Sequence, residues 1–231
     1  MAETPKARWP ALVLFDLDGT LIDSAPDIAA ATNELLKRHA HAPLTLDDVR
    51  SMIGNGVKKL VERAFEKRGA KLDNGALSDR TNEMMEIYAA NLTGLTVRMQ
   101  GADQLLKNLA AKECKLALVT NKPEVFSRRI LVHFGWDDIF HAVVGGDSCL
   151  TRKPDPEMLL YACKQTGCDT GATIMVGDSS ADISSARNAG IKSIAVRGGY
   201  TNIAVDDLGA DAVANRLCDV MEAMAQLQLE H

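Results

Sequence analysis

Short apolar runs alternate with amphipathic segments over most of this chain, and this alternation limits the possible folds more than any other feature. The first run, Ala11–Phe15, ends directly at Asp16. Four similar runs follow at Lys115–Thr120, His141–Val144, Thr173–Val176 and Lys192–Val196. The segments between them have helical periodicity: Ala102–Ala111, Glu124–Phe134, Glu157–Gln165 and Ala181–Ala189. Apolar runs of this length are typical of strands that are buried on both faces. The sequence therefore predicts an α/β fold with a doubly wound, mainly parallel sheet.

The stretch from Ser24 to about Thr93 breaks the alternation, because it carries only helical signals. Ser24–Asp27 and Thr45–Asp48 each have the pattern of a capping box at the start of a helix. One helical face recurs at Val57, Leu60, Val61, Ala64 and Phe65. An all-helical block after the first strand predicts a cap over the α/β core.

The domain boundaries follow from this block. We expect residues 23–95 to form the helical cap, and residues 1–22 together with 96–228 to form the α/β core. Residues 229–231 look like the remnant of an expression tag and are left out of the fold prediction.

Charge and cysteine content exclude several classes of partner. The formal net charge is −5, so there is no broad basic field for nucleic acid or an anionic membrane surface. No apolar run is long enough to span a membrane, and no signal peptide is recognisable. The five cysteines are odd in number and lack the spacing of a zinc site, which argues against a disulfide framework. We therefore expect a cytoplasmic protein that binds neither nucleic acid nor a membrane.

Polar side chains gather where the predicted strands end, and ligands of open α/β sheets bind at these carboxyl ends. The residues concerned are Asp16, Asp18, Thr120, Lys153, Asp178 and Asp182. Several acids near one point repel each other, so a cation is expected among them, and oxygen ligands favour Mg²⁺. Lysine and threonine supply donors for a phosphate. A carboxylate can attack phosphorus while a second carboxylate two residues away acts as acid and base.

Single positions in this set also have plain structural interpretations. Asp16-Leu-Asp-Gly-Thr20 alone suits a turn at a strand end, and Thr120-Asn-Lys-Pro123 suits the start of a helix. Asp182 is equally compatible with a first-turn acid that the helix dipole favours. Both interpretations stay open for Asn121 and Lys122, whereas the complete set favours function for Thr120 and Lys153.

The same residues resemble the motifs of a known family. Asp16-Leu-Asp-Gly-Thr-Leu-Ile-Asp-Ser24 is similar to the first motif of the haloacid dehalogenase-like phosphatases. The other three motifs are matched, in the same order, by Thr120-Asn-Lys122, Lys153-Pro154 and Gly177-Asp-Ser-Ser-Ala-Asp182. The resemblance covers nearly the whole chain and implies a Rossmann-like core with a helical cap.

This resemblance also implies a role for each motif residue. Asp16 would be the nucleophile that forms an aspartyl-phosphate, and Asp18 would be the acid and base. Thr120 and Lys153 would hold the transferring phosphoryl group. The implied Mg²⁺ ligands are Asp16, the backbone carbonyl of Asp18, and Asp178, with Asp182 supporting the metal's waters or Lys153. A dehalogenase is not expected, because dehalogenases of this family lack the carboxylate at the position of Asp18.

The segment Ile53–Phe65 is similar to bacterial phosphoglycolate phosphatases, as are Asp23–Pro26, Val144–Asp147 and Gly199-Tyr200. This similarity implies a phosphoric monoester hydrolase that converts 2-phosphoglycolate to glycolate and phosphate. Gly54, Asn55 and Gly56 precede a helix whose free N–H groups favour an anionic group such as a carboxylate. We assign these three residues to substrate binding, together with Thr120, Asn121 and Lys153. Ala181 departs from the asparagine that relatives often have.

Three alternative functions remain open, of which two keep the aspartyl-phosphate chemistry and one is not catalytic. A phosphatase for a sugar phosphate or another small metabolite would keep the core residues and differ in the cap. A β-phosphoglucomutase-like phosphotransferase would hand the phosphoryl group to a sugar hydroxyl instead of water. A non-catalytic phosphate-binding protein would not need Asp18. The expected partner is a small phosphomonoester, and the chain is expected to be a monomer or homodimer.

Overall fold

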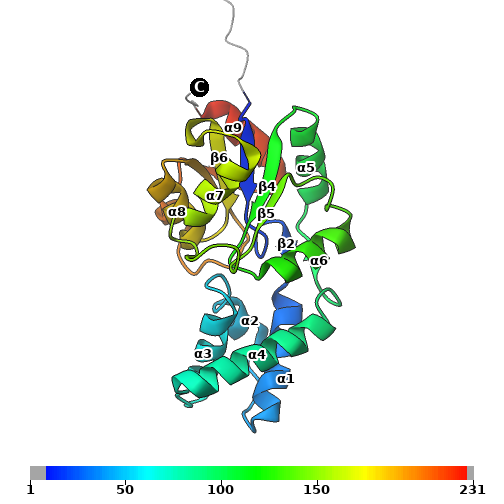
Figure 1. Ribbon diagram of the computed structural model, residues 1–231, viewed down its shortest axis with the longest axis vertical. Helices are drawn as coiled ribbons and strands as arrows, with labels where there is room; N and C mark the ends of the chain where they lie inside the picture. The colour runs from blue at the N-terminus through cyan, green and yellow to red at the C-terminus, as the bar shows by residue number, and fades with distance from the viewer. Residues whose placement is uncertain (1–8, 228–231) are drawn as a thin grey trace, which may run out of the picture.

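The computed structural model describes residues 9–227, which form an α/β core and a helical insert (Figure 1). The core has a six-stranded parallel sheet in the order β5-β4-β1-β6-β7-β8. These strands are β1 (Leu12–Phe15), β4 (Lys115–Val119), β5 (Ala142–Val144), β6 (Thr173–Gly177), β7 (Lys192–Val196) and β8 (Ala212–Ala214). Strand β1 is central, with Leu12 opposite Lys115 on one side and Thr173 on the other. The predicted α/β fold with a parallel sheet is confirmed.

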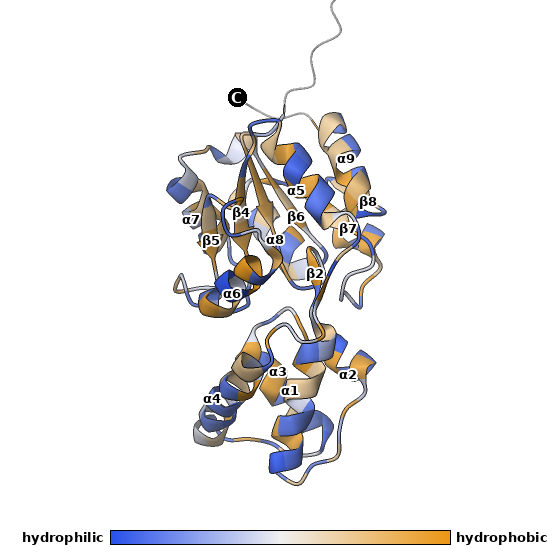
Figure 2. Ribbon diagram, turned by 90° about the vertical axis from the view of Figure 1, so that its right-hand side faces the viewer, coloured by the Kyte–Doolittle hydropathy of each residue, from blue (hydrophilic) through white to orange (hydrophobic). Residues whose placement is uncertain are grey.

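Helices cover both faces of the sheet, so most side chains of its strands are buried and apolar (Figure 2). They are α5 (Ala102–Ala110), α6 (Glu124–Phe134), α7 (Glu157–Thr166), α8 (Ser180–Ala189) and α9 (Val220–Gln226). Short 3-10 turns add η1 (Thr170–Ala172), η2 (Val205–Leu208) and η3 (Leu217–Asp219). Val13 and Phe15 pack in one cluster with residues of α5, α6 and α9. Leu12 and Leu14 pack in another cluster with residues of α7 and α8. The side chains of β1 thus contribute alternately to the hydrophobic clusters on the two faces of the sheet.

The helical insert lies between two short strands, β2 (Ile22–Asp23) and β3 (Val97–Arg98), which pair antiparallel. It contains α1 (Ala25–Arg38), α2 (Leu46–Arg50), α3 (Val57–Lys67) and α4 (Asn74–Ala90). Helix α1 packs on α2 and α4, and α3 packs on α4. The insert faces the end of the core where β1 passes into β2 (Figure 1). The helical cap is confirmed, while its limits at residues 23 and 95 stay a prediction, and residues 229–231 lie outside the described part.

The sequence did not predict three of the strands. Strands β2 and β3 have two residues each and β8 has three, which is too short for any periodicity to stand out. Their formation depends on neighbours elsewhere in the chain, as β2 pairs with a segment that follows the whole insert.

One of the two predicted capping boxes is present and the other is wrong. Thr45 and Asp48 exchange both capping bonds at the start of α2. At the start of α1, Ser24 makes no side-chain cap bond. Its hydroxyl instead donates to Asp18 at 2.5 Å, and the Asp27 carboxylate accepts from Thr96. Tertiary partners therefore replace the local bonds that the pattern suggested.

Within the described residues, no helix has both the length and the apolar character needed to cross a membrane.

Candidate active site

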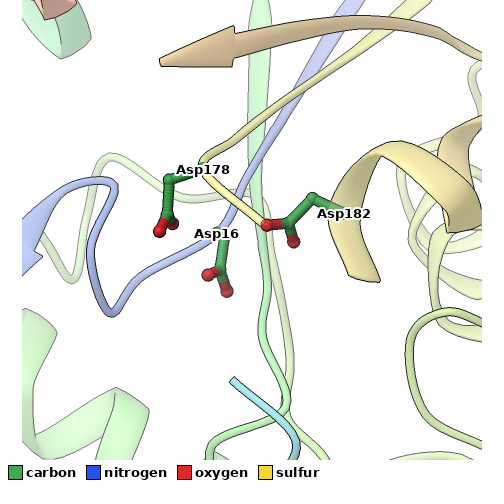
Figure 3. A group of neighbouring side chains, drawn as sticks. All are labelled: Asp16, Asp178 and Asp182. Atoms are coloured by element: carbon green, nitrogen blue, oxygen red, sulfur yellow. The ribbon is translucent and has the colours of Figure 1, made fainter. Parts of the chain in front are cut away.

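The strand-end residues meet at the edge of the sheet that faces the insert. Asp16 follows β1, Asp178 follows β6, and Asp182 lies in the first turn of α8. One carboxylate oxygen from each of these three residues lies within 4.8 Å of the others. Figure 3 shows the three side chains next to one another. They come together because the ends of the neighbouring parallel strands β1 and β6 lie side by side.

Lys153 is enclosed by this acidic group. Its ammonium donates to Asp16 Oδ1 at 2.9 Å, to Asp182 Oδ1 at 2.5 Å and to the carbonyl of Val119 at 2.7 Å. Burial alone would lower the pKa of Lys153, but the carboxylates of Asp16 and Asp182 raise it above its ordinary value. Lys153 is therefore a fixed positive charge beside Asp16.

Asp182 has two structural partners. Its Oδ1 accepts from Lys153, and its Oδ2 accepts from the backbone N–H and hydroxyl of Ser179. The second set of bonds forms a capping box at the start of α8. Because its Oδ1 accepts from the Lys153 ammonium, Asp182 is suited to orient Lys153 beside Asp16.

Asp16 and Asp178 hold their protons more tightly than ordinary aspartates. Burial raises the pKa of Asp16 to about 6, against the opposing effect of Lys153. Burial and the nearby Asp182 and Asp16 raise the pKa of Asp178 to about 8. Asp178 is fixed by the hydroxyl of Thr20 at 2.8 Å and the N–H of Tyr200 at 2.7 Å.

The donor set fits a divalent cation. Four buried or nearly buried carboxylates, those of Asp16, Asp18, Asp178 and Asp182, face two ammonium groups, those of Lys122 and Lys153. When all four carboxylates are ionised, two negative charges are in excess, and hard oxygen ligands of this kind bind hard divalent cations. The residues that would hold the ion are Asp16 and Asp178, whose carboxylates gain most from a neighbouring positive charge.

Asp18 has partners that the sequence did not reveal. Lys122 donates to its Oδ1 at 2.9 Å and its Oδ2 at 3.1 Å, and the Ser24 hydroxyl donates to Oδ1 at 2.5 Å. Lys122 also donates to the hydroxyl of Tyr88 from the cap at 2.8 Å. The only sequence signal was the position of Lys122 two residues after Thr120, which also suits a helix start.

The predicted substrate loop lies over this site. Gly54 and Gly56 line a cavity of about 50 Å³ together with Asp16, Asp18 and Thr120. The remaining walls come from the cap and from the segment after β4: Ile28, Ile53, Val57, Leu60, Met84, Tyr88, Asn121 and Lys122. A second, wider opening is also lined by Asp16 and Asp18, together with Asn55, Arg63 and Tyr200 among others. The structure therefore places all three loop residues next to the acidic group.

Asn121 joins the loop to Lys153. Its amide group donates to the carbonyls of Gly54, at 2.8 Å, and Lys153, at 3.0 Å. Its oxygen accepts from the N–H of Lys153 at 3.0 Å. This side chain therefore holds the cap loop and the Lys153 loop in place.

Comparison with known proteins decides the family. The family model described as haloacid dehalogenase-like hydrolase matches residues 13–196. The chain belongs to this hydrolase family. A phosphoglycolate phosphatase of Psychrobacter arcticus is 42% identical over 194 residues, which are 82% of this chain and 84% of that protein. One from Caulobacter vibrioides is 36% identical over 217 residues, or 94% and 92% of the two chains.

A solved structure that is similar to this chain in sequence has the same fold. The crystal structure of a predicted phosphoglycolate phosphatase from Haemophilus somnus superposes with a TM-score of 0.87 at 30% identity. The match covers 95% of this chain and 99% of that chain, so it includes both the core and the helical insert. The family resemblance predicted from the motifs is confirmed.

Ala181 contributes none of the bonds of the Lys153 ammonium. Its side chain lines the wider opening beside Asp178. The ammonium of Lys153 is bonded by Asp16, Asp182 and the Val119 carbonyl without any contribution from position 181.

Proposed function

We propose that this chain is a phosphoric monoester hydrolase that converts 2-phosphoglycolate to glycolate and phosphate, with Mg²⁺ and an aspartyl-phosphate on Asp16. The observation that carries the chemistry is the pair Asp16 and Asp18 after β1, with Lys153 at 2.9 Å from Asp16. The substrate is supported by relatives named phosphoglycolate phosphatase that are 42% and 36% identical over most of both chains.

In the first step Asp16 attacks the phosphorus and the bond from phosphorus to the glycolate oxygen breaks. Lys153 holds Oδ1 of Asp16 and lies next to the phosphoryl group that Asp16 receives. Asp18 gives its proton to the departing oxygen, which would otherwise leave as an unstable alkoxide. We assign Thr120, which lines the cavity together with Asp16, to donate to a phosphoryl oxygen.

In the second step a water molecule attacks the aspartyl-phosphate, and Asp18 takes its proton. The same carboxylate can serve both steps because the first one leaves it ionised. Phosphate is released and Asp16 is restored.

The proposed metal is Mg²⁺, with Asp16, the backbone carbonyl of Asp18 and Asp178 as ligands. When bound, Mg²⁺ neutralises the charge of the phosphoryl oxygens and of the carboxylates around it. Asp182 would act through Lys153, whose ammonium it holds.

Substrate selection is proposed to lie in the loop Gly54-Asn55-Gly56 at the start of α3. The free N–H groups at this helix end favour an anion, and the small cavity suits a compact group such as the carboxymethyl part of 2-phosphoglycolate. Asn121 fixes this loop by its bond to Gly54.

We further propose a cytoplasmic location and a monomer or homodimer. The location is supported by the five cysteines, which are all free thiols.

The proposal is tested by phosphate release from a panel of small phosphoesters, with and without Mg²⁺, for the wild type and Asp16→Asn. Selective, Mg²⁺-dependent hydrolysis of 2-phosphoglycolate that Asp16→Asn abolishes is the expected result. Hydrolysis of other phosphoesters but not of 2-phosphoglycolate would overturn the substrate assignment. Equal activity of Asp16→Asn would overturn the mechanism.

A further inference from the structure

Lys122 is a buried cation that connects the cap to Asp18. Its side chain is only 4% exposed. The ammonium makes three bonds, to both carboxylate oxygens of Asp18 and to the hydroxyl of Tyr88. These account for the three N–H groups that a lysine can donate. Tyr88 belongs to α4 of the cap, 34 positions away from Lys122 in the sequence. A cap residue therefore completes the surroundings of a core lysine that touches Asp18.

The surroundings of Lys122 favour its charged form. Burial alone would lower its pKa, but Asp18 and Tyr88 raise it above the ordinary value. Burial also raises the pKa of Tyr88 to about 12, so that its hydroxyl stays neutral. Lys122 donates to both oxygens of Asp18, so it can fix the position and the rotation of this carboxyl group.

The Tyr88 ring is itself held in place. It packs edge-on against Phe126 of α6 with ring centroids 5.5 Å apart, and Tyr88 is 3% exposed. Lys122 also lies over the Tyr88 ring, 4.7 Å from its centroid. Tyr88 is therefore packed against the core, and Lys122 is fixed from the cap side only while the cap lies on the core.

We infer that Lys122 is a positioning residue that fixes Asp18 for proton transfer, and that Tyr88 makes this positioning depend on the docked cap. The inference rests on the proposed function, in which Asp18 is the acid and base. In the first step an oxygen of Asp16 bonds to phosphorus, the phosphorus–oxygen bond of the ester breaks, and the proton of Asp18 moves to the leaving oxygen. A displaced Asp18 slows the departure of an alkoxide but not of an anion that is already stable.

Two substrates whose leaving groups differ in their need for a proton can distinguish the positioning of Asp18 from a general effect on charge or folding. Acetyl phosphate is a small substrate whose acetate departs without a proton, whereas glycolate needs one. Lys122→Met removes the charge and keeps the length of the side chain. Tyr88→Phe removes only the hydroxyl and keeps the ring against Phe126. The measurement is kcat/KM with Mg²⁺ for both substrates, because this ratio reports the first chemical step and not the hydrolysis of the aspartyl-phosphate.

We expect Lys122→Met to lower kcat/KM for 2-phosphoglycolate by about 100-fold, the range of a lost acid catalyst. For acetyl phosphate the value should stay close to that of the wild type. Tyr88→Phe should show the same selectivity with a loss of about 10-fold, as for one hydrogen bond to a charged group. Asp18→Asn provides the reference pattern for complete loss of the acid. In that background, Lys122→Met should add no further leaving-group dependence, since nothing is left to position.

Equal losses on the two substrates would overturn the inference, because a charge or folding effect acts on both alike. If Lys122→Met does not fold, Tyr88→Phe decides the matter by the same comparison. A wild type that hydrolyses other alkyl phosphates but not 2-phosphoglycolate would instead overturn the proposed substrate. The comparison would then use the preferred alkyl ester, so the two failures are distinguishable.

Discussion

Asp178 lies between two glycines, Gly19 and Gly199, that leave no room for a side chain. A Cβ on Gly19 would be 2.7 Å from Asp178 Oδ2, and a Cβ on Gly199 would be 2.2 Å from the same atom. Distances this short do not occur between such atoms in a packed interior. Gly19 also has a left-handed backbone, with φ of 89°. At Gly199, by contrast, glycine is required because the Asp178 side chain occupies the space that a Cβ would need.

Gly199→Ala should therefore displace Asp178 and damage the proposed metal site. We expect kcat/KM to fall by about 100-fold, as for other small displacements of catalytic groups. Titration calorimetry should show weaker Mg²⁺ binding, since Asp178 is a proposed ligand. Gly75→Ala is the control, because a Cβ there would approach nothing closer than 3.4 Å. Normal Mg²⁺ affinity in Gly199→Ala would show that Asp178 does not bind the ion.

Site residues that directly follow a strand were easier to identify from the sequence than site residues that meet where the cap contacts the core. Asp16, Asp178 and Thr120 each follow an apolar run, so the fold class alone brings them to one edge. Lys122 and Tyr88 gave no such signal. Tyr88 belongs to an apolar helical stripe that suits core packing, and its hydroxyl meets Lys122 only when cap and core are docked. No pattern within one segment contains that information.

At the scale of elements, Asp27 ties helix α1 to the second connection between cap and core. Its carboxylate accepts from the N–H of Leu95 at 2.9 Å, and from the N–H and hydroxyl of Thr96 at 2.7 Å each. Asp27 is 3% exposed, so these N–H groups have little access to water. The start of α1 is thus fastened to the chain segment that leads from the cap back to the core.

Asp27→Ala should destabilise the protein and loosen the connection. Losing these charge-assisted bonds in a buried position should lower the free energy of unfolding by about 3 kcal/mol. Urea unfolding gives this value, and hydrogen exchange at Leu95 and Thr96 should become faster. Glu34→Ala, on the same helix but in exposed pairs with Lys37 and Arg38, should change little. Equal stability of the two variants would show that Asp27 does not fasten the connection.

Long elements were predictable from the sequence, whereas their connections were not. The apolar run of β1 and the periodic face of α3 are local patterns that survive folding unchanged. The Ser24–Asp27 pattern failed because Asp27 finds stronger donors in a segment almost 70 positions further along. A capping box and a long-range hydrogen bond to the backbone use the same residue types, and only the complete fold decides which of the two forms.

At the scale of the whole molecule, burial makes ionisation of Asp16 and Asp178 unfavourable, and a proton or a metal ion can relieve this cost. Burial raises the pKa of Asp16 to about 6 and that of Asp178 to about 8, from an ordinary value of 3.8. Between about pH 4 and pH 8 the folded protein therefore binds more protons than the unfolded chain. Stability without metal must then decrease as pH rises through this window. The rise for Asp16 alone corresponds to about 3 kcal/mol.

Thermal unfolding in the presence of a chelator should accordingly show a Tm that falls from about pH 5 to pH 8. Mg²⁺ should raise the Tm little at pH 5, where protons occupy the site, and most at pH 8, where both carboxylates are ionised. Asp178→Asn is the matched control, because it removes one titrating group while keeping the shape of the side chain. Its metal-free Tm should depend less on pH, and Mg²⁺ should stabilise it less. A wild-type Tm that instead rises from pH 5 to pH 8 without metal would mean that Asp16 and Asp178 are ionised at little cost. The excess negative charge would then not be what draws a divalent cation to this site.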